Sequence, residues 1–198
     1  MPKFTEQEKE QIRQSLLSKG RELFIQYGLA KTSIDDIVLA CEIGKGSFYK
    51  FFSSKEELYF AILKNEEEVR ETVLNQLFKE ELSSKELLSS FFHTSFQFVE
   101  ENPFLQRVFQ NGEHERLMRK LPHEMMAFSE HNMNRGTLAI HTLIERGILP
   151  KEDPQVIVGI IKAIMMLRLH KEEIGDELFP KVMEKIIDFI AEGLTKER

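Results

Sequence analysis

One short stretch of the chain combines side chains that bind phosphate with aromatic rings that brace a helix. Its basic, small and hydroxyl-bearing residues are Lys45, Gly46, Ser47, Tyr49 and Lys50. The two ammonium groups can neutralise phosphates, the phenol can donate to a phosphate oxygen, and the glycine lets the backbone approach DNA closely. The serine hydroxyl is short enough to reach a base edge. A basic, aromatic-bearing helix after a turn is typical of a helix-turn-helix recognition element.

Two helices are predicted ahead of this stretch. A capping box formed by Thr5 and Glu8 opens the first helix, and Gly28 ends it in a left-handed conformation. Thr32 and Ser33 are each followed by an acid three residues later, so the second helix begins there. The basic stretch is therefore the third helix of a small head.

The turn that leads into the third helix is predicted at Cys41–Gly44, and the helix itself at Lys45–Phe52. Phe51 and Phe52 are predicted to fill the core of the head, because phenylalanine prefers burial. Phe48 is predicted to lie more open.

Only helical patterns follow the head. A long helix is predicted from about Ser54 to Glu80, and further helices at 84–101, 104–110, 113–120, 122–146, 155–173 and 178–194. No alternating strand pattern, internal repeat or low-complexity tract occurs. The predicted fold is all-α with about nine helices: a three-helix DNA-binding head over 1–55 and a helical domain over 56–198.

Charge and composition narrow the class of protein. The 198-residue chain has a net charge of -6, but residues 1–55 hold nine basic and seven acidic side chains. The acidic remainder would repel phosphate and help to orient the basic end towards it. No apolar run reaches the length of a membrane span, the N-terminus is too charged for a secretory signal, and there is one cysteine, so we expect a cytoplasmic protein.

The spacing of particular residues resembles the TetR-type bacterial transcriptional regulators. The residues that carry this resemblance lie between positions 12 and 63, and they are Gly28, Thr32, Ser33, Ile34, Asp36, Ile37, Gly46, Tyr49, Phe52, Lys55, Glu56 and Leu58. The resemblance implies a homodimer whose last two helices form the interface. It also implies a double-stranded DNA operator, and a small-molecule effector that binds the helical domain and weakens operator binding.

The resemblance also implies which residues contact DNA. They are Thr32, Ser33, Lys45, Gly46, Ser47, Tyr49, Lys50 and Lys55. Thr32 would sit at a helix N-terminus, where a hydroxyl and backbone N–H groups suit a phosphate oxygen. Lys55 would open the fourth helix near the DNA backbone.

Two residues depart from the family pattern at the predicted turn. Glu42 stands where the family commonly has glycine, and a positive φ there would cost about 1 kcal/mol. Gly44 replaces the usual serine or threonine cap ahead of Lys45, which weakens the cap by roughly a few tenths of a kcal/mol.

Aromatic and methionine side chains between Phe91 and Met133 suit an apolar effector pocket, although most of them must also form ordinary core. The predicted ligand-binding residues are Phe92, Phe96, Met118, Phe128, Asn132 and Arg135. The polar members lie on one helical face, which equally suits a solvated stripe. A largely apolar effector is therefore expected.

Two other classes of protein stay as alternatives. A helical enzyme is disfavoured, because no nucleophile elbow, phosphate loop or metal-ligand spacing occurs, and neither a catalytic residue, a metal nor a cofactor is expected. Either alternative, the enzyme or a protein-interaction module, would use the apolar pocket predicted between Phe91 and Met133.

The last two predicted helices carry a hydrophobic face, which favours a dimer. Its residues are Ile160, Ile164, Leu167, Val182, Ile186, Phe189 and Ile190.

Overall fold

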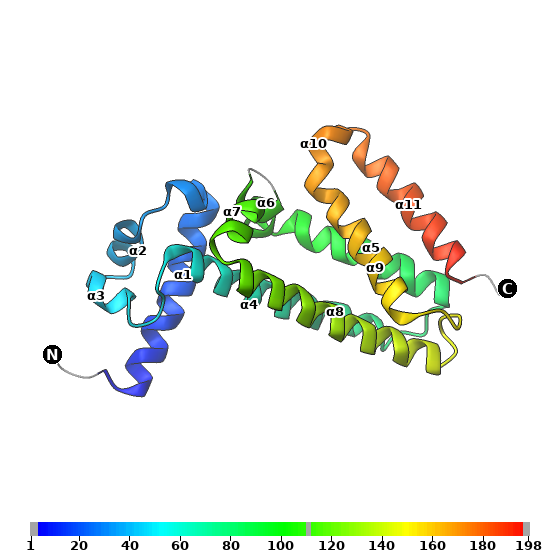
Figure 1. Ribbon diagram of the computed structural model, residues 1–198, viewed down its shortest axis with the longest axis horizontal. Coiled ribbons are helices and arrows are strands. Elements are labelled where there is room, and N and C mark those ends of the chain that lie inside the picture. The colour runs from blue at the N-terminus through cyan, green and yellow to red at the C-terminus, as the bar shows by residue number, and fades with distance from the viewer. Residues whose placement is uncertain (1–3, 110–111, 196–198) are drawn as a thin grey trace. The chain divides into compact units, whose positions relative to one another are not determined.

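The protein is described by a computed structural model covering residues 4–109 and 112–195 (Figure 1). These residues form α-helices, one short 3-10 helix and connecting turns, without a strand, so the prediction of an all-α fold is confirmed. The elements are α1 (Glu6–Lys31), α2 (Ile34–Ala40), α3 (Lys45–Phe48), α4 (Lys55–Leu77), α5 (Ser84–Glu101), α6 (Pro103–Phe109), α7 (Glu113–Lys120), α8 (Pro122–Glu145), α9 (Pro154–Met166), η1 (Leu167–His170), α10 (Lys171–Ile174) and α11 (Phe179–Gly193).

The described residues divide into two compact units. The first contains the residues up to Val69 together with those from Asn102 to Pro122, so it joins α6 and α7 to the N-terminal helices. The second contains Arg70–Glu101 and the residues from His123 onward. None of the described helices combines the length and the hydropathy needed to cross a lipid bilayer.

The first unit buries side chains from every helix of the head. Fully buried members of this core are Leu16, Phe24, Leu29, Ile37, Phe48, Leu58 and Tyr59. α1 packs against α2, α6 and α7, and α2 packs against α3. Burial of several large apolar side chains, each worth roughly 1.5–3 kcal/mol, holds α3 in place although four residues are too few for an independent helix.

Side-chain caps begin several helices as the sequence predicts. Thr5 and Glu8 form the expected capping box on α1, and Ser33 with Asp36 forms one on α2. Ser33 Oγ accepts from the Asp36 N–H at 3.1 Å, while the Asp36 carboxylate accepts from the Ser33 N–H at 2.9 Å. The Asp36 carboxylate also accepts from the Ser33 hydroxyl at 2.6 Å, and this hydrogen bond, followed by the one from the Ser33 N–H, holds the pKa of Asp36 below its usual value.

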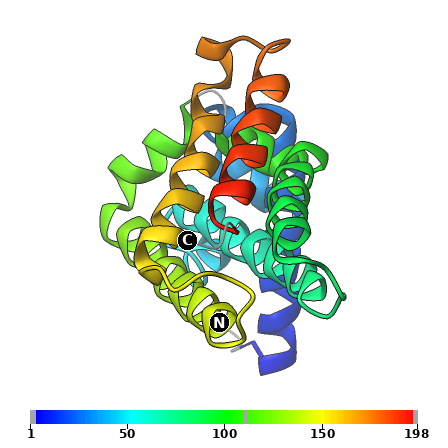
Figure 2. The ribbon, with the colours of Figure 1, turned by 90° about the vertical axis from the view of Figure 1, so that its right-hand side faces the viewer.

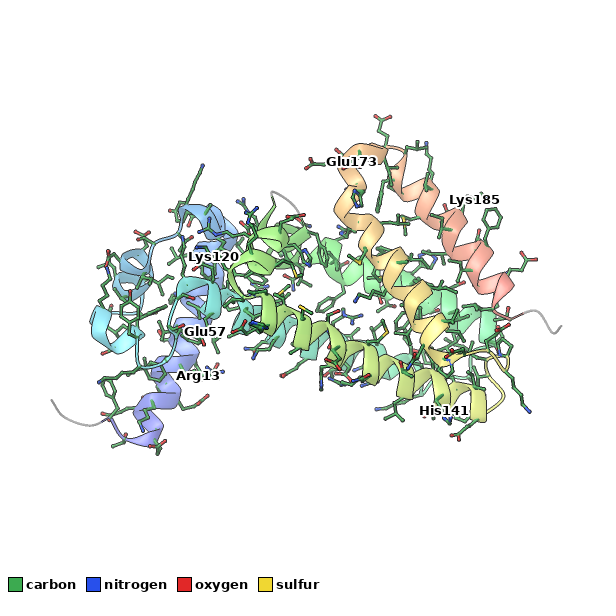
Figure 3. All side chains as sticks on the ribbon, in the orientation of Figure 1. Arg13, Glu57, Lys120, His141, Glu173 and Lys185 are labelled. Carbon is green, nitrogen blue, oxygen red and sulfur yellow. The ribbon has the colours of Figure 1, made fainter. Side chains whose placement is uncertain are left out.

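In the second unit, α5 contributes side chains to two apolar clusters. One cluster combines Phe92 and Phe96 of α5 with Ile164 of α9 and with Phe179, Met183 and Ile187 of α11. The other combines Leu87 and Leu88 of α5 with residues of α8 and α9. Figures 1 and 2 show α9 and α11 connected at one end through η1 and α10. Lys185 on α11 and His141 on α8 project into solvent (Figure 3).

Three predicted helix limits need correction. The third helix ends at Phe48 and not at Phe52, because the Phe48 carbonyl accepts from the N–H groups of both Phe51 and Phe52 and the chain turns there. The predicted break at Gly28 is confirmed, since Gly28 has φ 78° and ψ 164°, but the residues after it are helical as far as Lys31.

The helix predicted over 155–173 is interrupted after Met166 by η1 and α10. In η1 the guanidinium of the buried Arg168 lies 3.3 Å from Glu100 Oε1 of α5.

Of the burial predictions for the three phenylalanines of the head, the one for Phe52 is confirmed and the other two change. Phe48 and Phe52 are buried, whereas Phe51 is only half-buried. Phe48 is thus core and not open.

The capping box on α2 predicts a pH-dependent effect on stability. Folding lowers the pKa of Asp36 from 3.8, so the ionised carboxylate stabilises the folded state. This stabilisation is fully present above pH 3.8 and is lost as the pH falls through the lower pKa of the folded state. We expect Ser33→Ala to lower the melting temperature near pH 7, and the difference from wild type to shrink below pH 3.8. Thermal melts across pH test this, with the exposed mid-helix Ser18→Ala as control; a difference constant with pH would contradict it.

Candidate nucleic-acid interface

The turn between α2 and α3 is built around Glu42. The Glu42 N–H donates to the Leu39 carbonyl at 3.1 Å, and the Ile43 N–H donates to the Val38 carbonyl at 3.0 Å. Glu42 has φ 54°, and it is the one non-glycine residue with positive φ among those described. Gly44 then caps α3 without a side-chain hydrogen bond. Both departures noted in the sequence therefore lie within the turn, as expected.

One face of α3 and its C-terminal turn is exposed. Lys45, Gly46, Tyr49 and Lys50 are exposed, and Ser47 is half-buried. A Cβ at Gly46 would meet no described atom within 4 Å, so the backbone there is open to a ligand. The Tyr49 ring packs edge-on against the buried Phe48 ring, with centroids 5.5 Å apart. The ring is thereby braced while Tyr49 stays 52% exposed.

The two lysines of this face have partners in the protein. Lys45 Nζ lies 2.8 Å from the Asp35 carboxylate of α2, which raises the pKa of Lys45 above its usual value, mainly by hydrogen bonding. Lys50 Nζ lies 4.6 Å from the centre of the Phe4 ring, a cation–π contact. Arg13, labelled in Figure 3, lies 5.6 Å over the Phe52 ring. Sequence reasoning missed the contributions of Asp35, Phe4 and Arg13.

Three further predicted contact residues lie at the junction of α1 and α2. Thr32 is 1% exposed, and its hydroxyl donates to the Gly28 carbonyl at 2.8 Å. Ser33 is occupied by the capping box. Lys55 Nζ donates to the carbonyls of Leu29 and Thr32 at 2.7 and 2.6 Å. Burial lowers the pKa of Lys55. Local structure thus engages all three polar groups, and their contact with DNA stays a prediction.

The predicted ligand residues are distributed over both units. Phe92 and Phe96 are buried in α5, while Phe128 and Asn132 of α8 are half-buried. The exposed Arg135 of α8 forms an ion pair with Glu71 of α4. All five belong to the second unit, and the exposed Met118 belongs to the first.

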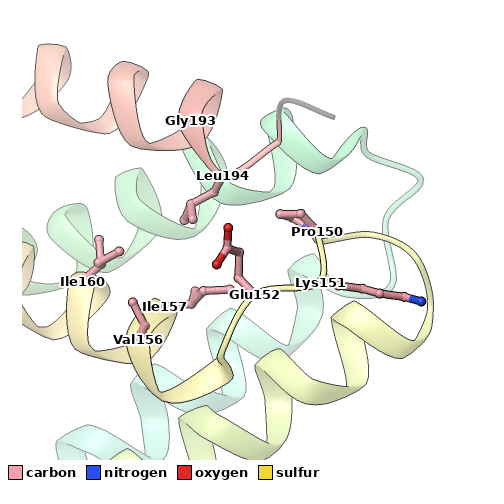
Figure 4. A pocket seen from close by; sticks show the side chains of 8 residues that line it. All are labelled: Pro150, Lys151, Glu152, Val156, Ile157, Ile160, Gly193 and Leu194. Carbon is pink, nitrogen blue, oxygen red and sulfur yellow. The ribbon is translucent and has the colours of Figure 1, made fainter. Parts of the chain in front are cut away.

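A cavity of about 440 Å³ opens elsewhere in the second unit (Figure 4). It lies between the start of α9, the preceding loop and the end of α11, and it is lined by Pro150, Lys151, Glu152, Val156, Ile157, Ile160, Gly193 and Leu194. None of the six predicted ligand residues lines it, so the effector site stays a prediction from sequence.

The head defines a class of protein. Two helices joined by a tight turn, with the second exposing a basic face and burying an aromatic one, form a helix-turn-helix DNA-binding domain. Residues 16–62 match the sequence model of the family described as bacterial regulatory proteins, tetR family. The predicted resemblance is confirmed over this N-terminal domain, which matches the TetR-type transcriptional regulators.

The relatives agree with this assignment. A stretch of 45 residues is 44% identical to the HTH-type transcriptional repressor DhaR of Mycobacterium sp. (strain GP1), covering 23% of each chain. The matched stretches span less than a quarter of the length of the curated relatives.

Solved structures match over nearly the whole chain. A TetR-family transcriptional regulator from Pectobacterium atrosepticum gives a TM-score of 0.76 at 20% identity, covering 98% of this chain and 100% of that one. A putative TetR-family regulator from Syntrophomonas wolfei str. Goettingen gives 0.74 at 21% identity, covering 96% and 99%. At these identities the likeness establishes the fold.

The positive φ of Glu42 predicts that a glycine is more stable there. Removing the Cβ relieves a conformation that costs an L-residue about 1–2 kcal/mol, part of which is offset by the greater unfolded-state entropy of glycine. We expect Glu42→Gly to raise the free energy of unfolding by about 0.5–1 kcal/mol in urea denaturation. Glu42→Ala keeps the Cβ and should give no such gain. If both variants raised the free energy of unfolding equally, the gain would come from removing the Glu42 charge and not from relieving its positive φ.

Proposed function

We propose that the protein is a homodimeric repressor that binds a palindromic DNA operator and is released by a small-molecule effector in the cytoplasm. The observation that carries the proposal is the exposed face of Lys45, Gly46, Tyr49 and Lys50 on a TetR-type helix-turn-helix domain. Two such faces, one from each subunit, would enter successive major grooves about 34–36 Å apart.

The exposed groups suit contacts to the DNA backbone more than readout of bases. Lys45 and Lys50 can each neutralise a phosphate, and the Tyr49 hydroxyl can donate to one. The half-buried Ser47 is the member of this face whose short side chain suits a base edge. Gly46 adds no side chain that would hold the helix away from the groove.

Dimerisation is supported by apolar side chains on α9 and α11 that no described residue covers fully. Val156, Met166, Leu178 and Phe189 are all exposed. Residues of α11 at other helical positions are buried against α5 and α9, so the exposed ones lie on its outer side. A second subunit that covers this side would bury area worth about 25 cal/mol per Å² and would give the two-fold symmetry of a palindromic operator.

Release by an effector is proposed from the family resemblance and from the aromatic side chains of α5. Phe92 and Phe96 suit an apolar ligand, and Asn132 is a half-buried polar group on α8. A ligand shifts the protein only if it binds the DNA-free form more tightly. Loss of operator occupancy on adding a small apolar compound is the result that release requires.

Operator binding is tested by a gel shift on the DNA upstream of the protein's own coding region. Binding should weaken steeply with salt, because each phosphate contact releases condensed counterions. Tyr49→Ala should lower the affinity about tenfold, since a hydrogen bond to a charged phosphate is lost.

The matched control for this variant is Tyr27→Ala. Tyr49 is 52% exposed and Tyr27 49%, so both changes remove a half-exposed ring from the first unit. Equal affinities of the two variants, with unchanged melting temperatures, would remove Tyr49 from the interface. Salt-independent binding of a protein partner in place of DNA would support an interaction module.

The proposed dimer predicts the effect of a charge on α11. Phe189→Lys places an ammonium group on the interface, where burying it without a partner is strongly unfavourable, so we expect a monomer by sedimentation. Leu138→Lys is the control: Leu138 of α8 is 69% exposed and Phe189 68%. A Phe189→Lys protein that sediments as a dimer would place the interface elsewhere.

A further inference from the structure

Helix α1 is broken at Gly28, and the break leaves backbone groups without their helical partners. In a continuous helix the Leu29 N–H would donate to the Ile25 carbonyl, and the next N–H to the Gln26 carbonyl. The extended ψ of 164° at Gly28 prevents this. Buried backbone groups must find other partners, because each one left unpaired costs about as much as a lost hydrogen bond.

Side chains of α6 and α7 supply those partners on both sides of the break. Arg107 of α6 donates from Nε to the Ile25 carbonyl at 3.0 Å and from a terminal nitrogen to the Gln26 carbonyl at 3.2 Å. Glu113, the first residue of α7, accepts from the Leu29 N–H through Oε1 at 2.9 Å. The segment 102–122 therefore completes the hydrogen bonding of α1.

Glu113 is held from a second direction. Glu113 is only 6% exposed, and the other oxygen of its carboxylate accepts from the Tyr59 hydroxyl of α4. The Tyr59 ring is fixed between Phe24 and Phe104, with centroids 4.9 and 4.6 Å away. Burial, and then the hydrogen bond to Glu113, raise the pKa of Tyr59. The phenol is thus a constant donor to the carboxylate.

Glycine is required where the carboxylate reaches α1. A Cβ on Gly28 would lie 2.7 Å from Glu113 Oε1, and the residue has φ 78°. The carbonyls that follow the break are bound by Lys55, and Thr32 donates to the Gly28 carbonyl. The next residue is Ser33, which caps α2. The direction in which α1 leaves the break therefore sets where α2 and α3 begin.

We propose that Glu113, assisted by Arg107, is a positioning residue for DNA binding: it holds α1 broken at Gly28 and so fixes the placement of α2 and α3. The proposal rests on the proposed function. The segment that carries both residues is joined in sequence to α5 at one end and to α8 at the other. It therefore gives the effector-binding part of the chain a covalent route to the recognition element that is separate from α4.

The test compares Glu113→Ala with Glu115→Ala in the full-length protein. Glu115 lies on the same helix but is exposed. At a temperature where both variants are fully folded by circular dichroism, Glu113→Ala should lower operator affinity at least about tenfold, and Glu115→Ala less than about twofold. Amide exchange at Leu29 should accelerate in Glu113→Ala alone. Glu113→Gln keeps an acceptor for that N–H and should restore most of the affinity.

Each outcome decides between hypotheses. If the wild-type protein does not bind the operator, the proposed function fails. If the wild type binds and folded Glu113→Ala binds equally well with only a lower melting temperature, Glu113 is structural and the positioning role is overturned.

If Glu113→Ala does not fold, Arg107→Gln is compared with Arg119→Gln, since Arg119 is exposed on α7. A folded Arg107→Gln protein should bind more weakly than Arg119→Gln. Equal operator affinities of these two variants would also overturn the proposal.

Discussion

The first unit depends on satisfying the backbone groups that the break at Gly28 exposes. Their partners are Lys55 of α4, Arg107 of α6 and Glu113 of α7, which are far away in the sequence and all charged. Hydrogen bonds to charged groups are worth roughly 1.5–3 kcal/mol, and removing one partner leaves the other buried and unpaired. The junction between α1 and α2 is therefore rigid, because side chains from several elements bind its backbone at the same time. The same residues explain why Asn102–Pro122 packs with the N-terminal helices.

Helix α3 is very short, yet one side of it is buried and the other is exposed. Phe48 and Phe52 turn inward and fix the helix on the core, with ring centroids 6.1 Å apart, so Lys45, Tyr49 and Lys50 are left on the outer side. The hydrogen bonds of a four-residue helix cannot offset the free-energy cost of nucleating it, so tertiary packing must provide the stabilisation. Phe48 and Phe52 are four residues apart, so both rings lie on the same side of this element and the basic residues are left on the other.

Sequence patterns predicted the features that depend on neighbours within about four residues. The capping boxes at Thr5 and Ser33, the glycine cap before Lys45 and the unusual residue at Glu42 are all of this kind. The burial of Phe48, the interruption after Met166 and the carbonyl partners of Lys55 depend on elements distant in sequence, and they were missed. Glu113 gave no local signal at all, because an acid at the start of a helix is ordinary. Only the structure around Gly28 shows that the Glu113 carboxylate accepts a hydrogen bond from the backbone of α1.

The partners of the two exposed lysines bear on the energetics of operator binding. Phosphate would compete with Asp35 for Lys45, and breaking an exposed ion pair of this kind costs at most about 1 kcal/mol. The Phe4 ring need not be displaced from Lys50, since a cation can rest on a ring face and still donate to a phosphate from its other protons. Asp35 therefore reduces the net attraction of Lys45 for DNA, whereas Phe4 restricts the Lys50 side chain before DNA arrives.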